Sequence, residues 1–206
     1  MQLTATTFLQ QLGAQIAKGL DAEYRFFKST LELRAPIPVG HNVIILSGSN
    51  KFSPHISISF YFGKNFAAAK TIEKLLGPHR FYYHIQQYSL GRQPRYAATY
   101  QGPDNWQVDI TAPPPNLVAE IVAAIHGMAN PFFDRFNTIQ AARDAIAADD
   151  PGCFGGSPYW RQLLLLDLAM NDLSHFERWS EKLGDFERAQ AAEEIIQYRA
   201  AISHVV

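Results

Sequence analysis

The stretch that decides the fold is His55-Ile-Ser-Ile-Ser-Phe-Tyr-Phe62. Apolar and polar side chains alternate along it, and a period of two places successive side chains on opposite faces of a β-strand. One face then carries only apolar residues, which are Ile56, Ile58, Phe60 and Phe62. We predict a strand over residues 55–62 that packs this face against a hydrophobic core.

Short aromatic or β-branched runs, separated by turn residues, lie on both sides of this strand. They predict further strands over residues 24–28, 31–35, 43–46, 81–88, 96–100 and 106–110. Because the connections between neighbouring strands are short, we expect a mainly antiparallel, meandering sheet.

Two helices are expected in the same part of the chain. Apolar residues at steps of three and four predict the first over residues 7–18, where Thr7 and Gln10 have the spacing of a capping box. The second is predicted to follow the 55–62 strand and to end at Gly77-Pro78. We expect both helices to cover one face of the sheet.

Prolines 113–115 mark a change, because nearly every segment after them has helical periodicity. Residues 160–170 are apolar on almost all sides, which predicts a buried central helix. Asp185 is expected to cap the last helix. Its predicted buried stripe consists of Ala189, Ala192, Ile195, Ile196 and Ile202.

The predicted fold class is therefore α+β. An antiparallel sheet with its helices is expected over residues 1–112, followed by a helical part over residues 113–206. We expect the two parts to form a single domain over residues 1–206, because the proline run is too short to separate them.

The two parts carry opposite net charge. Residues 1–112 hold 11 Lys and Arg against 6 Asp and Glu, whereas residues 113–206 hold 7 against 13. The formal net charge of the whole chain, −1, hides this polarity. A charge distribution of this kind bears on binding partners more than on the fold.

The composition is that of a globular protein, since 47% of the residues are hydrophobic and 18% are charged. The single cysteine, Cys153, cannot form an internal disulfide and suits a reducing compartment. The sequence contains neither a signal-peptide pattern nor an apolar run long enough to cross a membrane. We expect a soluble, cytoplasmic protein that does not associate with membranes.

Motifs for catalysis, cofactors or metals are absent from the sequence. The seven histidines lack the i, i+4 spacing of metal ligands on a helix, and neither Cys-x-x-Cys nor Gly-x-Ser-x-Gly occurs. Asp149 and Asp150 are typical of a solvated turn rather than of a chelating pair. We predict no metal, no cofactor and no catalytic residue. An enzyme without a recognisable motif stays an alternative.

An acidic surface is the first candidate site. Carboxylates cluster on the last two predicted helices and form a candidate surface for a basic protein partner. Interleaved basic residues also fit a face that serves only solubility. The candidate partner-binding residues are Glu177, Glu181, Asp185, Glu187, Glu193 and Glu194.

A second candidate site interleaves basic and aromatic residues on predicted strands. Such strands hold single-stranded nucleic acid in some proteins, although strand aromatics also serve as core and cross-strand pairs. Binding of nucleic acid or a nucleotide is therefore the alternative function. The candidate ligand-binding residues are Arg80, Tyr82, His84, Arg92, Arg95 and Tyr96.

The first helix, Phe26-Phe27-Lys28, the 55–62 strand and Asn130-Pro131-Phe132-Phe133-Asp134 together resemble small bacterial α+β domains without a known function. Some similar domains are immunity proteins encoded beside secreted toxins. The resemblance implies a bacterial, intracellular, single-domain protein, and it transfers no catalytic residue.

The leading hypothesis is therefore a non-catalytic, cytoplasmic bacterial protein that binds another protein, as a toxin-neutralising protein does. The expected partner is a basic toxin domain. The sequence leaves the oligomeric state and the identity of the partner open.

Overall fold

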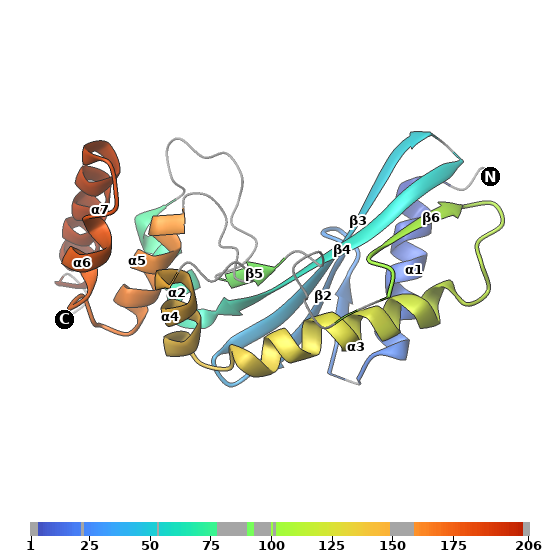
Figure 1. Cartoon of the computed structure of the whole chain (residues 1–206), viewed down its shortest axis with the longest axis horizontal. Coiled ribbons are helices and arrows are strands. Elements are labelled where there is room, and N and C mark those ends of the chain that lie inside the picture. The colour runs from blue at the N-terminus through green and yellow to red at the C-terminus, as the bar shows by residue number, and fades with distance from the viewer. Residues whose placement is uncertain are drawn as a thin grey trace.

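Two long antiparallel strands, β3 (Gly40–Phe52) and β4 (His55–Phe66), form the centre of the sheet (Figure 1). The computed structural model describes residues 4–21, 23–52, 54–77, 90–92, 100, 102–148 and 159–203. Both strands are longer than the sequence predicts, and β4 continues four residues beyond Phe62.

The sheet is antiparallel throughout its described strands, as predicted. β1 (Arg25–Phe27) pairs with β2 (Glu32–Ile37), and β2 pairs with β3. The far edge of β4 has two partners, because β6 (Asn105–Asp109) pairs with its first half and β5 (Leu90–Arg92) with its second. The strands predicted over residues 81–88 and 96–100 lie outside the described residues, apart from Tyr100.

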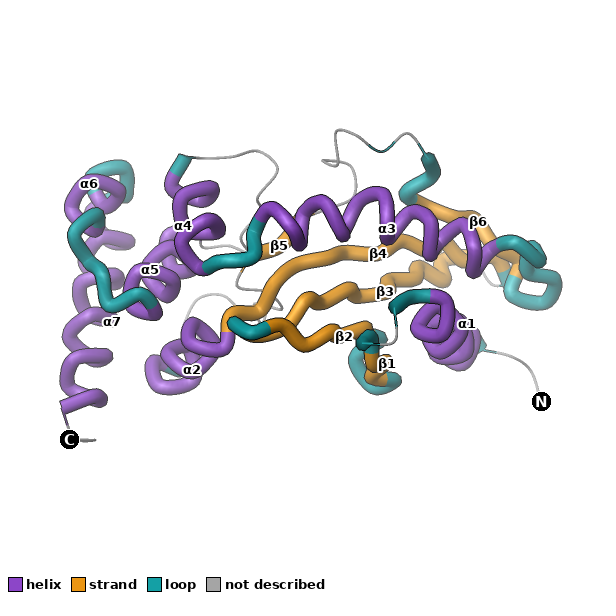
Figure 2. The backbone as a smooth tube through the Cα atoms, turned by 90° about the horizontal axis from the view of Figure 1, so that it is seen from below, coloured by secondary structure: helices purple, strands orange, loops and turns teal. Residues whose placement is uncertain are grey.

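The predicted alternation along β4 is confirmed, since Ile56, Ile58, Phe60 and Phe62 are each at most 1% exposed. Two helices cover this face, α1 (Ala5–Gly19) and α3 (Leu117–Arg135), and they contact each other (Figure 2). Phe132 of α3 packs edge-on against Phe62, with ring centroids 5.3 Å apart.

The prediction that the first two helices cover the sheet is wrong for the second, α2 (Ala67–Leu76). It packs mainly against helices from the C-terminal part of the chain. The reason is the extra length of β4, which stays paired with β3 as far as Phe66, so that α2 begins only at the end of the sheet. Leu75, near the end of α2, is 53% exposed.

The predicted start of α1 also needs correction. Thr4 is the N-cap, and its hydroxyl oxygen accepts a hydrogen bond of 3.2 Å from the backbone N–H of Thr7. Gln10 does not complete a capping box, because its side chain donates to the carbonyl oxygen of Lys28, 3.3 Å away. The helix therefore starts one residue after the true cap, at Ala5.

The part of the chain after α3 is helical, as predicted. It contains α4 (Ile139–Ala147), α5 (Tyr159–Ala169), α6 (Phe176–Ser180) and α7 (Asp185–Ser203). Every residue of α5 from Trp160 to Leu168 is buried, which confirms it as the central helix of this part. The fold is α+β, with the sheet and α1 towards one end of the long axis and α6 and α7 at the other (Figure 1).

Buried residues from both parts belong to one hydrophobic cluster. The single-domain organisation over residues 1–206 stays a prediction. Among the residues that the structure describes, no helix combines the length and the apolar character needed to cross a membrane.

Candidate protein-binding surface

The six predicted partner-binding carboxylates do not form one continuous acidic face. Glu177, Glu181, Asp185 and Glu193 are exposed, whereas Glu187 is half-buried. The sixth, Glu194, points inward and is described next. The structure therefore leaves four of the six fully available to a partner.

Glu194 belongs to a buried ion pair and not to the surface. The two oxygens of its carboxylate lie 2.9 and 3.0 Å from Nε of Arg161 in α5. Arg161 also donates from Nη2 to the carbonyl oxygen of Gly77, at the end of α2. Burial raises the pKa of the Glu194 carboxyl, and the charge of Arg161 opposes that shift. This ion pair determines which side of α7 packs against the other helices.

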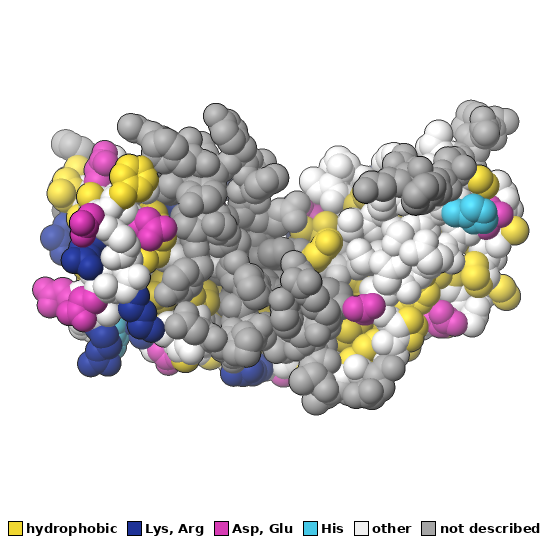
Figure 3. Space-filling view, turned by 45° about the horizontal axis from the view of Figure 1, so that its top comes forward, with side chains coloured by type: hydrophobic (Ala, Val, Ile, Leu, Met, Phe, Trp, Pro, Cys, Tyr) yellow, Lys and Arg dark blue, Asp and Glu magenta, His cyan; other side chains and the backbone are white. Residues whose placement is uncertain are grey.

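Basic side chains share the surface with the four exposed carboxylates. Arg178, Lys182, Arg188 and Arg199 are all exposed on α6, on α7 or between them. Arg188 donates from Nε to the carbonyl oxygen of Ser180, 3.1 Å away, near the end of α6. At this end of the molecule acidic and basic side chains lie side by side with apolar ones (Figure 3). The charge of this surface is mixed.

The outer side of α7 is unexpectedly apolar. Phe186 is 63% exposed and Ile196 is 66% exposed, and both belong to a helix whose buried residues are Ala191 and Ile195. The predicted buried stripe is therefore wrong at four of its five positions. Only Ile195 is buried, and the four residues with exposed side chains are Ala189, Ala192, Ile196 and Ile202.

We call the exposed row on this side the outer stripe, defined as Phe186, Ala189, Glu193, Ile196 and Ala200. Its members follow one another at steps of three, four, three and four residues, so they lie along one face of the helix. All five are exposed. The steps of three and four residues are visible in the sequence. The prediction failed because the adjacent residues Ile195 and Ile196 lie on different sides of the helix, and both were assigned to one buried stripe.

A second buried network holds α6, the short helix before α7, in place. Asp167 of α5 is fully buried, and its Oδ1 accepts from Nε of Arg143 at 2.8 Å. Its Oδ2 accepts from Nε1 of Trp179 in α6, also at 2.8 Å. Burial raises the pKa of Asp167, while the two donors work against that shift. The network therefore ties α4, α5 and α6 together, and its role is structural.

Lys64 is a buried charge that the sequence reasoning missed. It lies at the end of β4, 2% exposed, with Nζ 5.9 Å from the centroid of the Phe133 ring. Burial lowers its pKa to about 8, and the charge of Asp134 acts in the opposite direction. Its cross-strand neighbour is Asn42, whose buried Oδ1 has no hydrogen-bond partner among the residues that the structure describes. The pair is a polar site within the sheet.

The alternative ligand-binding residues fall almost entirely outside the described part of the chain. Arg80, Tyr82, His84, Arg95 and Tyr96 lie in undescribed stretches. The backbone of Arg92 is described in β5, where it pairs with Phe62. The nucleic-acid alternative therefore stays a prediction.

Possible metal ligands are scattered through the described ranges. No three His, Cys, Asp or Glu side chains within them gather closely enough to hold a metal ion. Cys153, Asp149 and Asp150 are not among the described residues. The predictions on metals and cofactors stay predictions.

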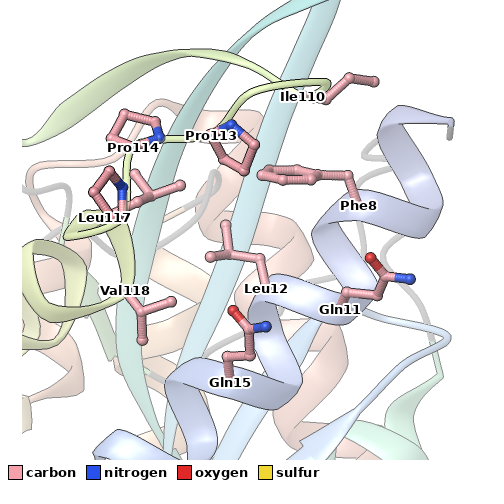
Figure 4. Close-up of a pocket in the computed structure, with 10 residues that line it drawn as sticks. Phe8, Gln11, Leu12, Gln15, Ile110, Pro113, Pro114, Leu117 and Val118 are labelled. Carbon is pink, nitrogen blue, oxygen red and sulfur yellow. The ribbon is translucent and has the colours of Figure 1, made fainter.

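A groove of about 390 Å³ separates α1 from the start of α3 (Figure 4). Phe8 and Leu12 of α1 face Pro113 and Leu117 across it. None of its ten lining residues is charged, and its polar side chains are two exposed glutamines. The groove is an apolar depression beside the proline run.

No family model, no curated protein and no solved structure matches this chain. The resemblance to small bacterial domains therefore stays a prediction, and function has to be argued from the residues of this chain.

Proposed function

We propose that the protein acts without catalysis, by binding an amphipathic helix of a protein partner along the outer stripe of α7. The observation that carries this proposal is the exposure of Phe186 and Ile196, 63% and 66%, on one helix face. Complete burial of a fully exposed side chain of this size contributes about 1.5–3 kcal/mol, and about two thirds of each side chain is still exposed. Helix-to-helix recognition uses apolar anchors at such steps of three and four residues.

The charges beside the stripe describe the partner more closely. Asp185 directly precedes Phe186, Glu193 belongs to the stripe itself, and Arg199 lies near the other end of the helix. A matching helix would carry basic residues opposite the first half of α7 and an acidic residue opposite Arg199. A uniformly basic partner and a toxin-neutralising role stay predictions. The four exposed carboxylates support them, but the basic side chains beside those carboxylates do not.

The test begins with capture from lysate of the native host and identification of the retained proteins. Each captured protein is then purified, and its affinity is measured by calorimetry for the wild type and for Ile196→Glu. Phe27→Glu is the matched control, because Phe27 is a 40% exposed aromatic residue in β1, far from α7 in Figure 2. Hydrogen exchange of the complex shows which segment becomes protected.

We expect Ile196→Glu to weaken binding at least about tenfold, Phe27→Glu to bind normally, and protection to appear in α7. Reversing Glu181 and Asp185 to lysine separates the charge contribution from the apolar one, since it leaves the stripe unchanged. Equal affinities of the wild type and Ile196→Glu, or protection confined to another segment, would refute the proposal.

A further inference from the structure

We infer that the helix which binds the outer stripe is α7 of a second copy of this chain, paired in the antiparallel direction. This inference rests on the proposed function and names the partner. Three features of α7 support it: the spacing of the stripe, the size of the residues beside it, and the position of two opposite charges.

The spacing of the stripe fits a two-helix seam. Steps of three and four residues keep one row of side chains facing a partner helix. Consider an antiparallel pair whose two-fold axis lies level with residue 191. Phe186 then lies opposite Ile196 of the second copy, and Ile196 lies opposite Phe186. Phe186 and Ile196, the two large exposed side chains of the stripe, would therefore bury each other at two symmetric places in the dimer.

Each contact at the middle of this pair includes a small residue. Ala189 lies opposite Glu193 of the second copy, and Ala192 lies beside its own counterpart. Small side chains let two helices approach closely. Glu193 keeps its carboxylate at the edge of the seam, where Gln197 already donates to it at 3.0 Å.

Opposite charges meet in the same arrangement. At 100° per residue, Asp185, Ala192 and Arg199 all lie on one side of the stripe. In the antiparallel pair, Asp185 therefore faces Arg199 of the second copy diagonally across the seam, and symmetry repeats the contact. A parallel pair would instead bring the two Glu193 carboxylates together at one level of the seam. Charge complementarity thus selects the antiparallel direction.

The experiment measures the mass of the full chain by sedimentation equilibrium over a range of concentrations. Four proteins are compared with the wild type: Ile196→Glu, Asp185→Arg, Arg199→Asp, and the double swap Asp185→Arg/Arg199→Asp. All the substituted positions are exposed. Circular dichroism and thermal unfolding verify that each variant is folded.

We expect the wild type to dimerise reversibly and Ile196→Glu to remain monomeric. Each single charge reversal places two like-charged pairs in the dimer and should raise its dissociation constant about tenfold. The double swap restores both pairs and should return the constant to within roughly threefold of wild type. Only the antiparallel arrangement predicts this rescue.

A wild type that stays monomeric at every concentration would overturn the inference. Binding of a different protein to α7, measured as described above, would then still support the proposed function. A dimer that survives Ile196→Glu would show that another surface joins the copies. A dimer lost in Ile196→Glu but not rescued by the double swap would exclude the antiparallel register.

Discussion

Arg161 and Glu194 join α5 to α7 through an ion pair that water hardly reaches. The Arg161 side chain is 3% exposed and the Glu194 side chain 14%, and their closest atoms are 2.9 Å apart. The same guanidinium binds the carbonyl oxygen of Gly77, so one side chain connects three helices. The direction in which α7 presents its outer stripe therefore depends on this contact.

Glu194→Ala should destabilise the protein by about 2–4 kcal/mol, because it leaves a buried arginine without its carboxylate. Urea denaturation measures the loss, and hydrogen exchange should show faster exchange in α7 first. Glu193→Ala is the matched control at the adjacent exposed position, where a change within about 0.5 kcal/mol is expected. Equal stabilities of the two variants would contradict the structural role of the pair.

Lys64→Met should stabilise the protein at neutral pH by about 1–3 kcal/mol, because it removes a buried charge and keeps an unbranched chain of similar length. Lys18→Met is the control, since Lys18 is exposed in α1. Thermal unfolding at pH 7 compares the three proteins. A lower unfolding temperature for Lys64→Met than for Lys18→Met would refute the prediction.

The pH dependence gives an independent check of Lys64. Its pKa is about 8 in the folded protein and 10.5 ordinarily. Between these values the unfolded chain binds more protons, so the stability of the wild type should rise with pH relative to Lys64→Met. The difference between the two proteins should be constant below pH 8 and shrink towards pH 10.5. A difference that does not change with pH would show that Lys64 is not desolvated.

Gly13→Ala should cost about 1–2 kcal/mol, although alanine favours a helix interior by about 1 kcal/mol over glycine. The added Cβ would lie 2.3 and 2.4 Å from two ring atoms of Phe26, which packs over α1. Gly184→Ala is the control, because a Cβ there meets open space. Chemical denaturation of both variants checks the prediction, and a neutral or stabilising Gly13→Ala would contradict it.

A fragment ending near Ala112 should not fold by itself. It lacks α3, whose Phe132 packs on Phe62, and so it would expose the apolar face of β4. Limited proteolysis of the full chain should therefore leave it intact or trim only its ends. A stable fragment of residues 1–112 with a cooperative unfolding transition would show that the chain has two domains.

The sheet was largely predictable because burial on one side leaves a clear period of two, as at residues 56, 58, 60 and 62. Strand ends were less predictable. The local sequence pattern does not predict that β4 continues to Phe66. The burial of Lys64 was therefore not predicted, and α2 was expected to cover the sheet. Thr4 was missed as a cap because Thr7 and Gln10 offered the same spacing three residues later.

The candidate site shows a different limit. α7 has a weak apolar row on each side, one containing Ala191 and Ile195 and the other Phe186 and Ile196. Periodicity alone could not decide which row is buried. The decision comes from Arg161, which lies 33 residues before Glu194 in the sequence and pairs with it only in the folded protein.

The burial of α5 on all sides has a consequence for how the protein folds. A helix that is buried on all sides cannot be shielded from water until its neighbours surround it, and those neighbours include α2 and α7, from distant parts of the chain. During synthesis α2 leaves the ribosome long before α7 does. Until α7 arrives, α5 remains partly uncovered and prone to aggregation. We expect chains truncated before Asp185 to depend on chaperones or to precipitate, even though every strand of the sheet is already present.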